Sequence, residues 1–262
     1  MLTPLNPPLP AWPDARVWIV GASTGIGAET AKLMLARGAR VAVSARSADK
    51  LAEVAGDGVA TGRALVEPLD FTDHRAVAAA CKRIAGQWGA IDLVLVVAGT
   101  HQEIRAWELT DANARALFET NLHGVVGTAA AVIPTLLAQK RGAIGIVSSV
   151  AGYGGLPKAL IYGASKAALI NFTEALYLDL NPRGIGVYLI NPGFVRTPLT
   201  ARNEFRMPHL IDADAAAREI VDGVERGDFE IHFPKAFSRQ LKLLRMLPYR
   251  WYFATVRKST GL

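Results

Sequence analysis

The sequence is poor in features that define several classes of protein. Among its 262 residues there is one cysteine, Cys81, so an internal disulfide bond is excluded. The residues around Cys81 alternate between apolar and charged, which favours a buried structural thiol over a reactive one. The five histidines are scattered, and no group of Cys and His has the spacing of metal ligands. We therefore expect no metal site.

Signals for membrane targeting or membrane spanning are scarce as well. The first 13 residues contain five prolines, and no basic residue precedes Arg16, which is unlike a secretory signal. The longest mostly apolar run, Val125–Ala138, has 14 residues, whereas a helix that spans a bilayer needs ~20. These features predict a cytoplasmic protein.

Acidic residues are missing from the last part of the chain. Residues 235–262 contain seven Lys and Arg and no Asp or Glu, while the net charge of the whole chain is +6. The helix expected there places four apolar residues near one face: Phe237, Leu241, Leu244 and Leu247. Such a helix either packs on its own subunit or a neighbour, or makes peripheral contact with an anionic membrane. Nucleic acid is a less suitable partner, because the positive charge is confined to a tail without a recognised binding module.

What the sequence does contain is a regular alternation of short apolar runs and helix-like stretches up to about residue 232. The runs are mostly apolar throughout, as in a parallel sheet covered on both faces: 16–20, 40–45, 63–68, 91–97, 143–148, 186–190 and 229–232. The stretches between them have apolar residues near helical spacing: 25–37, 72–87, 112–139, 159–180 and 212–226. This alternation predicts one Rossmann-like α/β domain over residues 15–234, with a doubly wound parallel sheet of about seven strands and helices on both faces. We expect residues 1–14 to be an N-terminal extension and residues 235–262 a basic, amphipathic helical extension.

A glycine-rich turn follows the first expected strand. Residues 21–27 read Gly-Ala-Ser-Thr-Gly-Ile-Gly and open a helical pattern, so pyrophosphate can bind the backbone N–H groups at a helix start. The spacing G-x-x-x-G-x-G differs from the common dinucleotide fingerprint G-x-G-x-x-G. It resembles the glycine motif of the short-chain dehydrogenase/reductase family, whose members move a hydride between a nicotinamide and a carbonyl or alcohol carbon.

The second expected strand bears on the choice between NAD and NADP. NAD-binding Rossmann folds carry an acidic residue near the end of this strand, and Ala45 stands there in this chain. Arg46 follows at once, and a guanidinium can pair with the 2′-phosphate of NADP and stack on adenine. The alternative is that Arg46 is a solvated residue at a helix start. We expect NADP(H) to be preferred over NAD(H).

Two further segments resemble the family's adenine and ribose contacts. Asp70 and Phe71 follow the third expected strand, where the family's aspartate receives the adenine amino group, and Thr72 or Asp73 can cap the next helix. Residues 96–99 read Val-Val-Ala-Gly, whereas the family usually has Asn-Asn-Ala-Gly. The small pair that lets the ribose approach is kept, and the two amides that brace neighbouring backbone are lost. We expect altered local packing and weaker cofactor binding, without loss of catalysis.

The clearest chemical signal is the pair Tyr162 and Lys166 at the start of a helical stretch. Positions i and i+4 share a helix face, so the phenol and the ammonium project to the same side. A nearby cation favours the phenolate and lowers the phenol pKa from its usual value of about 10. Ser149 ends a strand 13 residues before Tyr162, a distance at which the family keeps a serine. Asn121 resembles the family's helix asparagine, which completes a set of four catalytic residues.

The resemblance covers residues 15–200 and implies a mechanism. Tyr162 exchanges the proton with the substrate oxygen, which Ser149 orients. Lys166 sets the phenolate and holds the nicotinamide ribose, and Asn121 with Lys166 carries the proton to solvent. The segment from Pro192 to Thr197 resembles the family's contact to the nicotinamide amide. The cofactor contacts implied are Gly21, Ser23, Thr24, Gly25, Ile26, Gly27, Arg46, Asp70, Phe71, Ala98, Gly99, Tyr162, Lys166, Pro192, Gly193, Val195 and Thr197.

The substrate and the assembly are less defined by the sequence. Residues 197–208 are expected to form a lid, with an apolar inner face made by Phe194, Leu199, Phe205 and Met207. A hydrophobic carbonyl or alcohol would suit that lid and a tail on a membrane. The family often pairs the helices that correspond to 112–139 and 159–180, which implies a homodimer or homotetramer. The alternative function is a catalytically silent cofactor-binding or scaffolding protein of the same fold, which the valine pair makes conceivable.

Overall fold

The computed structural model describes residues 3–202 and 207–261. Its centre is a sheet in which all seven strands are parallel, in the order β3-β2-β1-β4-β5-β6-β9. In chain order these strands are β1 Arg16–Val20, β2 Arg40–Ser44, β3 Ala64–Val66, β4 Leu93–Val96, β5 Ala143–Val147, β6 Gly186–Pro192 and β9 Glu230–Phe233. The predicted Rossmann-like α/β fold is confirmed, with strand ends shifted by at most a few residues.

The strands form because their residues are apolar on both faces of the sheet. Every residue of β4, β5 and β6 is buried, and so are all but the first residues of β1 and β2. Such strands need cover on both sides, because a parallel sheet joined by helical crossovers has no solvent face.

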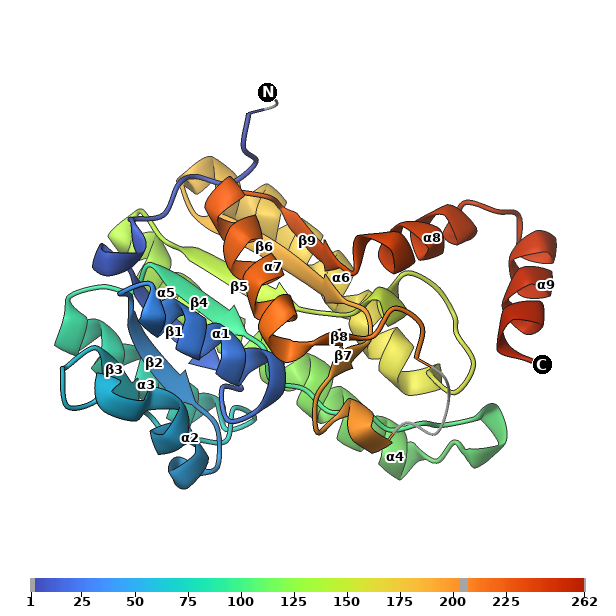
Figure 1. The fold of residues 1–262 in the computed structure, drawn as a ribbon, viewed down its shortest axis with the longest axis horizontal. Helices are drawn as coiled ribbons and strands as arrows, with labels where there is room; N and C mark the ends of the chain where they lie inside the picture. The colour runs from blue at the N-terminus through green and yellow to red at the C-terminus, as the bar shows by residue number, and fades with distance from the viewer. Residues whose placement is uncertain (1–2, 203–206, 262) are drawn as a thin grey trace.

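Two helical layers provide that cover (Figure 1). The helices α1 Gly25–Ala36, α2 Ala48–Ala55 and α7 Ala213–Arg226 bury their apolar residues in the core on one face. The helices α3 His74–Trp88, α5 Gly124–Gln139 and α6 Leu160–Leu180 do so on the other face. Helix α2 was not among the helices expected from the sequence.

The stretch expected as one helix over 112–139 is divided in the structure. Helix α4 Asp111–Phe118 runs into a π-helical segment, Glu119–His123, and α5 follows. By length and hydropathy the whole stretch Asp111–Gln139 is able to span a membrane. In this structure it is used differently, because its residues Val125, Ala129, Val132 and Leu136 are buried in the core against the sheet.

Smaller elements connect these layers. A second, two-stranded parallel sheet joins β7 Val195–Arg196 to β8 Ile211–Asp212 and was not predicted. The C-terminal extension forms two helices, α8 Lys235–Arg245 and α9 Tyr249–Thr260, and the chain bends between them at Pro248. The 3-10 turns are Trp12–Asp14, Gly56–Gly58, Ala106–Glu108, Val150–Gly152, Asn181–Arg183 and Thr200–Arg202.

Candidate active site

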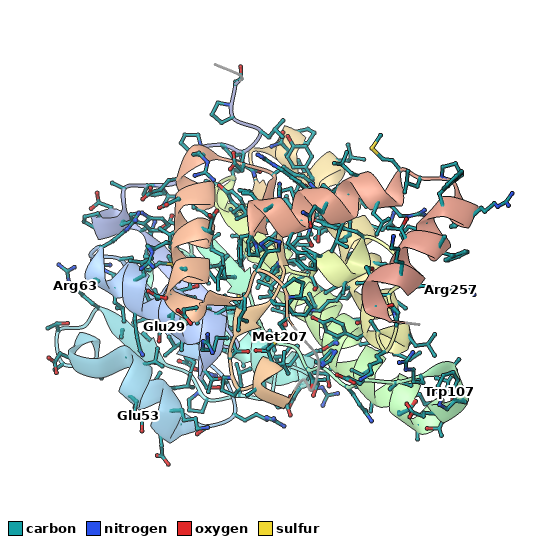
Figure 2. All side chains as sticks on the ribbon, turned by 45° about the vertical axis from the view of Figure 1, so that its right-hand side comes forward. Glu29, Glu53, Arg63, Trp107, Met207 and Arg257 are labelled. Atoms are coloured by element: carbon teal, nitrogen blue, oxygen red, sulfur yellow. The ribbon has the colours of Figure 1, made fainter. Side chains whose placement is uncertain are left out.

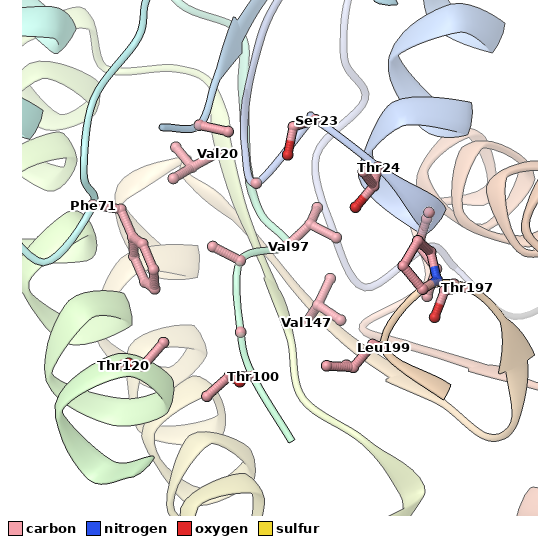
Figure 3. Close-up of a pocket in the computed structure, with 18 of the residues that line it drawn as sticks. Val20, Ser23, Thr24, Phe71, Val97, Thr100, Thr120, Val147, Thr197 and Leu199 are labelled. Atoms are coloured by element: carbon pink, nitrogen blue, oxygen red, sulfur yellow. The ribbon is translucent and has the colours of Figure 1, made fainter. Parts of the chain in front are cut away.

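A cleft of about 910 Å³ opens at the carboxyl ends of the strands. It lies where β1 and β4 are neighbours while the helices that follow them, α1 and α5, cover opposite faces of the sheet. Open α/β sheets bind ligands at such a switch point. Figure 3 shows side chains from several elements around this cleft, among them Val20, Phe71, Val147 and Thr197. With the exception of Asn121, every site residue expected from the sequence lines it.

The glycine turn brings the start of α1 close to the end of β4. Gly21 has φ +95°, and a Cβ there would lie 2.4 Å from the backbone nitrogen of Ala98. A Cβ on Gly27 would lie 2.2 Å from the carbonyl oxygen of Gly21. Larger residues would therefore push the turn away from β4. The side chain of Thr24, the N-cap of α1, makes no capping hydrogen bond, so the first amides of the helix face the cleft.

Positive charge gathers at the adenosine end expected from the sequence. Arg46 is exposed and lines the cleft just before α2, and Lys50 from the first turn of α2 lines it too. Among the described residues, neither side chain forms an ion pair within the protein. Lys50 was not predicted, because no helix was expected at α2. Recognising a short helix after Arg46 would have placed Lys50 in its first turn, close to Arg46.

Asp70 and Asp73 have separate roles in the turn after β3. The carboxylate of Asp70 accepts hydrogen bonds from the Thr72 backbone N–H (3.0 Å) and hydroxyl (2.8 Å). These bonds, with a contribution from the charge of Arg46, lower the pKa of Asp70. Asp73 caps α3 by accepting from the backbone N–H groups of Arg75 and Ala76. The cap therefore does not occupy Asp70, which lines the cleft.

Tyr162 and Ser149 meet at the inner end of the cleft. Their hydroxyls lie close enough for Ser149 to influence the pKa of the phenol. The Ser149 hydroxyl also accepts from the Ala151 backbone N–H (3.1 Å) and donates to the Pro192 carbonyl (3.3 Å). Burial raises the pKa of Tyr162, and the nearby Ser149 hydroxyl opposes that rise. The sequence led us to expect a lowered phenol pKa; in this structure the effect of burial is larger, so the phenol keeps its proton at neutral pH.

Lys166 is buried directly beneath the cleft, with 4% of its surface exposed. Its ammonium donates to the carbonyl of Val147 (3.1 Å) and lies 5.8 Å from the centroid of the Tyr162 ring. Burial lowers the pKa of Lys166 to about 8. The neighbouring Ser148 donates its hydroxyl proton to the backbone carbonyl of Lys166 (2.7 Å) and so fixes that turn of α6.

Asn121 lies in the π-helical segment and is fully buried. Its amide oxygen accepts from the backbone N–H of Thr100 (2.7 Å), and its amide nitrogen donates to the Thr100 carbonyl (2.9 Å). It therefore braces the chain just after Ala98 and Gly99 instead of lining the cleft. π-Helical turns are rare and occur often at functional sites. The local sequence gives no sign of this pairing, because the two residues are 21 positions apart.

The valine pair is accommodated by packing. Val96 belongs to the core on the α5 side, and Val97 packs against the core on the α1 side. The backbone N–H groups of Val97 and Ala98 both donate to the carbonyl of Val20, at 2.8 and 3.0 Å. Neighbouring strands thus hold this turn through backbone bonds.

The expected apolar lid is only partly located. Leu199 lines the cleft, whereas Phe194 stacks on Phe237 of α8 with ring centroids 5.4 Å apart. Met207 does not line the cleft, and Phe205 lies outside the described residues.

His101 was not predicted from the sequence. Its ring meets the Tyr162 ring edge-on, with ring centroids 4.6 Å apart, and burial lowers the pKa of His101.

A second polar cluster, also missed, lies behind Ser149. The carboxylate of Glu230 accepts hydrogen bonds from the Tyr153 phenol (2.6 Å) and the Asn191 amide (2.9 Å), and it pairs with the ammonium of Lys242. Tyr153 follows the Ser149 turn, Asn191 precedes Pro192, and Lys242 comes from α8. Burial opposes ionisation of Glu230, but these three partners together hold its pKa below the usual value. The cluster therefore ties the C-terminal extension to the backbone around the cleft.

Comparison with known proteins agrees with this geometry. A sequence profile described as short chain dehydrogenase matches residues 15–206. The chain belongs to this family. An uncharacterized oxidoreductase of Myxococcus xanthus is 35% identical, over 92% of this chain and 95% of its own length. The short-chain dehydrogenase described here is thus an NAD(P)-dependent oxidoreductase that acts on CH–OH or C=O groups.

Relatives of this short-chain dehydrogenase use either nicotinamide cofactor. A 2-dehydro-3-deoxy-L-rhamnonate dehydrogenase (NAD(+)) from a Sphingomonas strain is 33% identical, over 69% of this chain and 72% of its own. A short chain dehydrogenase from Burkholderia cenocepacia, solved in complex with NADP, has a TM-score of 0.80 at 27% identity. That match covers 92% of this chain and 97% of the other. These relatives support a nicotinamide cofactor, either NAD or NADP, for this chain.

Proposed function

We propose that the chain is an NADP(H)-dependent reductase of hydrophobic carbonyl compounds. The observation that carries the proposal is the convergence of Tyr162, Ser149 and Lys166 at the inner end of a cleft whose other end carries Arg46 and Lys50. A carbonyl next to the phenol and a phosphorylated ribose next to the two cations would occupy one continuous space.

The residues present fit a dinucleotide. The amides at the start of α1 face the cleft, and the turn at Gly21 and Gly27 leaves no space for a side chain that would cover them. Arg46 and Lys50 line the cleft and would pair with a 2′-phosphate, for which an acidic residue at the end of β2 would be unfavourable. Asp70 is available for the adenine amino group. The nicotinamide end of the dinucleotide would contact Pro192, Gly193, Val195 and Thr197.

The protein's own residues would transfer one proton to or from the substrate oxygen. When bound, the nicotinamide supplies or accepts the hydride. Tyr162, whose pKa burial raises, holds its proton at neutral pH and can donate it to a carbonyl oxygen, which favours reduction. Ser149 orients that oxygen through its hydroxyl. Lys166 holds a positive charge beside the ring at pH 7, and with Asn121 it completes the path that returns a proton to Tyr162.

A hydrophobic substrate is favoured by apolar residues that line the cleft and by the ring that packs on Tyr162. Val97, Val147 and Leu199 line the same part of the cleft in Figure 3. The ring of His101 packs on Tyr162 and is neutral at pH 7, because burial lowers its pKa. These side chains offer apolar contact and no fixed charge to a substrate carbonyl.

Cytoplasmic residence and a homodimer or homotetramer complete the proposal. Helix α6 exposes a stripe of residues at helical spacing: Ala164, Ala167, Asn171, Ala175 and Leu178. Leu178 is 73% exposed, and the small residues allow a second helix to approach closely. Pairing of α5 and α6 with their copies would cover this stripe. A Leu178→Arg variant that leaves the oligomer intact in gel filtration would contradict this part.

Cofactor titration tests the function. We expect the wild type to bind NADPH more tightly than NADH, with the preference falling about tenfold or more in Arg46→Ala, because a charge-assisted pair with phosphate is lost. Lys50→Ala should act in the same direction, and NADH affinity should change little in both. Arg63→Ala, an exposed arginine outside the cleft (Figure 2), serves as the control. Equal affinity for both cofactors would remove the NADP assignment, and binding of neither would favour a scaffolding protein.

A further inference from the structure

The two C-terminal helices have unequal faces. The inner face of α9 carries Tyr252 and Val256, which are buried, and the Tyr252 hydroxyl donates to the carbonyl of Gly155 (2.8 Å). In α8, Lys242 reaches Glu230 and Phe237 stacks on Phe194. Figure 1 shows α9 at the edge of the molecule, beyond α8. The inner faces therefore hold both helices in place, and the outer faces are left to solvent.

The outer faces are unusually apolar for a solvent surface. Of the fourteen large apolar side chains that are exposed among the described residues, six lie within residues 243–253: Leu243, Met246, Leu247, Tyr249, Trp251 and Phe253. Met246 is 80% exposed, and Leu243 and Trp251 are each 65% exposed. Six exposed apolar side chains within eleven residues are a local concentration of the kind that indicates an interaction site. We call these six residues the outer apolar face.

The charges around this face have one sign. Residues 235–262 hold no Asp or Glu. Two of the tail's cations are paired inside the protein, Lys242 with Glu230 and Lys235 with Glu219. Within the part of the chain that the structure describes, no ion pair is found for four others: Arg239, Arg250, Arg257 and Lys258. The outer apolar face is therefore bordered by positive charge that the protein does not neutralise.

We propose that the outer apolar face and its bordering cations dock on an anionic lipid surface. Trp and Tyr prefer the headgroup level of a bilayer, and apolar side chains beside them insert below it. Anionic headgroups attract each Lys or Arg that lies close to the surface. A second copy of the same face is a poor partner, since two faces of like charge repel. A space where α8 and α9 meet the 153–156 loop measures about 10 Å³, too small to receive a partner's side chain.

The surface has a consequence for the cleft. Tyr252 and Lys242 tie α8 and α9 to the segment that begins at Ser149. A protein docked through these helices would hold its catalytic serine turn close to the bilayer. Docking itself depends only on the outer face and is independent of the proposed reductase activity.

Vesicle flotation without cofactor or substrate tests the proposal. The wild type should float with phosphatidylcholine vesicles that contain about 30% phosphatidylglycerol, and about tenfold less with pure phosphatidylcholine. Binding should weaken as salt rises, because the charges involved are exposed. The double variant Trp251→Ala/Phe253→Ala and the double variant Arg250→Glu/Arg257→Glu should each lose about tenfold in partitioning.

A matched control distinguishes an effect of the outer apolar face from an effect of the protein's net charge. Arg75→Glu/Lys82→Glu changes the net charge by the same amount on α3, which lies at the opposite end of the molecule from α9 (Figure 1). It should float like the wild type. Equal losses in both charge variants, equal binding to neutral vesicles, or no binding by the wild type would each overturn the proposal. So would a change in oligomer size in Trp251→Ala/Phe253→Ala, which would make the face a contact between copies. NADPH titration of each variant checks that it is folded, and failure of that titration in the wild type concerns the proposed function alone.

Discussion

The ammonium of Lys166 lies 5.8 Å from the centroid of the Tyr162 ring and donates to the carbonyl of Val147 instead of the phenol oxygen. Both groups are buried in the same region, and burial shifts their pKa values in opposite directions, down for the lysine and up for the tyrosine. Each shift favours the neutral form. The buried positive charge of Lys166 therefore destabilises the folded protein at neutral pH, and this cost can be measured as a change in the free energy of unfolding.

Lys166→Met should abolish turnover and stabilise the protein without cofactor. The folded pKa of about 8 lies below the value of an unfolded lysine, so at pH 7 the folded state carries a cost of about 3 kcal/mol for the buried charge. Methionine removes that cost and loses one hydrogen bond worth ~1 kcal/mol, which leaves a gain of ~2 kcal/mol. Between pH 8 and about 10 the unfolded wild type binds more protons, so its stability should rise toward that of the variant.

Urea unfolding at pH 7 and at pH 9.5 measures this difference. Lys82→Met, an exposed lysine on α3, is the control and should change the free energy of unfolding by less than ~0.5 kcal/mol. A Lys166→Met protein that is less stable than the wild type at pH 7 would show that the ammonium is well compensated in the folded state.

Tyr162→Phe should separate binding from chemistry. The change removes the hydroxyl that meets Ser149 and leaves the ring that packs on His101. We expect kcat for ketone reduction to fall by about 10²–10⁴, the usual contribution of a general acid. NADPH affinity should stay within about twofold, because the ring keeps its place. Steady-state kinetics with fluorescence titration of NADPH measures both, and unchanged turnover would refute the role of Tyr162.

Much of this site follows from local sequence. The residues of the glycine turn, of the Tyr162 and Lys166 pair and of the segment after β6 are each close together in the chain, and each follows a recognisable strand. Parallel strands bring their carboxyl ends to one edge of the sheet, so placing the strands also places these residues around one cleft. The seven strands were predictable as well, since most of them are short runs of largely apolar residues.

What the sequence did not reveal depends on contacts between distant segments. Asn121 pairs with the backbone of Thr100 through a π-helical turn that no local pattern marks. Glu230, Tyr153 and Lys242 look like ordinary surface residues until β9 and α8 bring them together behind Ser149. Helix α2 has eight residues, about two turns, and was overlooked together with Lys50. The orientation of Phe194 toward α8 likewise depends on where the tail packs.

Substitution of Gly21 should destabilise the cofactor turn far more than its size suggests. Gly21→Ala places a Cβ 2.4 Å from the Ala98 nitrogen in a backbone with φ +95°, so either β4 or the turn must move. We expect a loss of at least ~2 kcal/mol in stability, or loss of NADPH binding if the turn moves alone. Gly86→Ala is the matched control: it lies inside α3, and a Cβ there meets nothing within 4 Å. It should stabilise by ~0.5–1 kcal/mol. Thermal unfolding of both variants decides the comparison.

The cluster at Glu230 makes a pH-dependent prediction. Because its folded pKa lies below the unfolded value, Glu230 adds stability above the unfolded pKa, and this stability is lost as pH falls through the folded pKa. Glu230→Gln keeps the shape and removes the charge that Lys242 and Tyr153 face. We expect a loss of about 1 to 2 kcal/mol at pH 7, since Lys242 is 38% exposed and solvent screens part of the attraction. The difference from wild type should vanish in acid.

The control is a carboxylate whose ion pair is on the surface. Asp111 and Arg115 are 78% and 79% exposed, so Asp111→Asn should cost less than ~0.5 kcal/mol at any pH. If both variants lost equally little stability, the Glu230 cluster would be no more than a surface ion pair.

The position of the Glu230 cluster behind the Ser149 turn leads to a second expectation, for the kinetics. Glu230→Gln should then lower kcat more than it raises KM, because Tyr153 and Asn191 flank the residues that we propose orient the substrate oxygen and the nicotinamide.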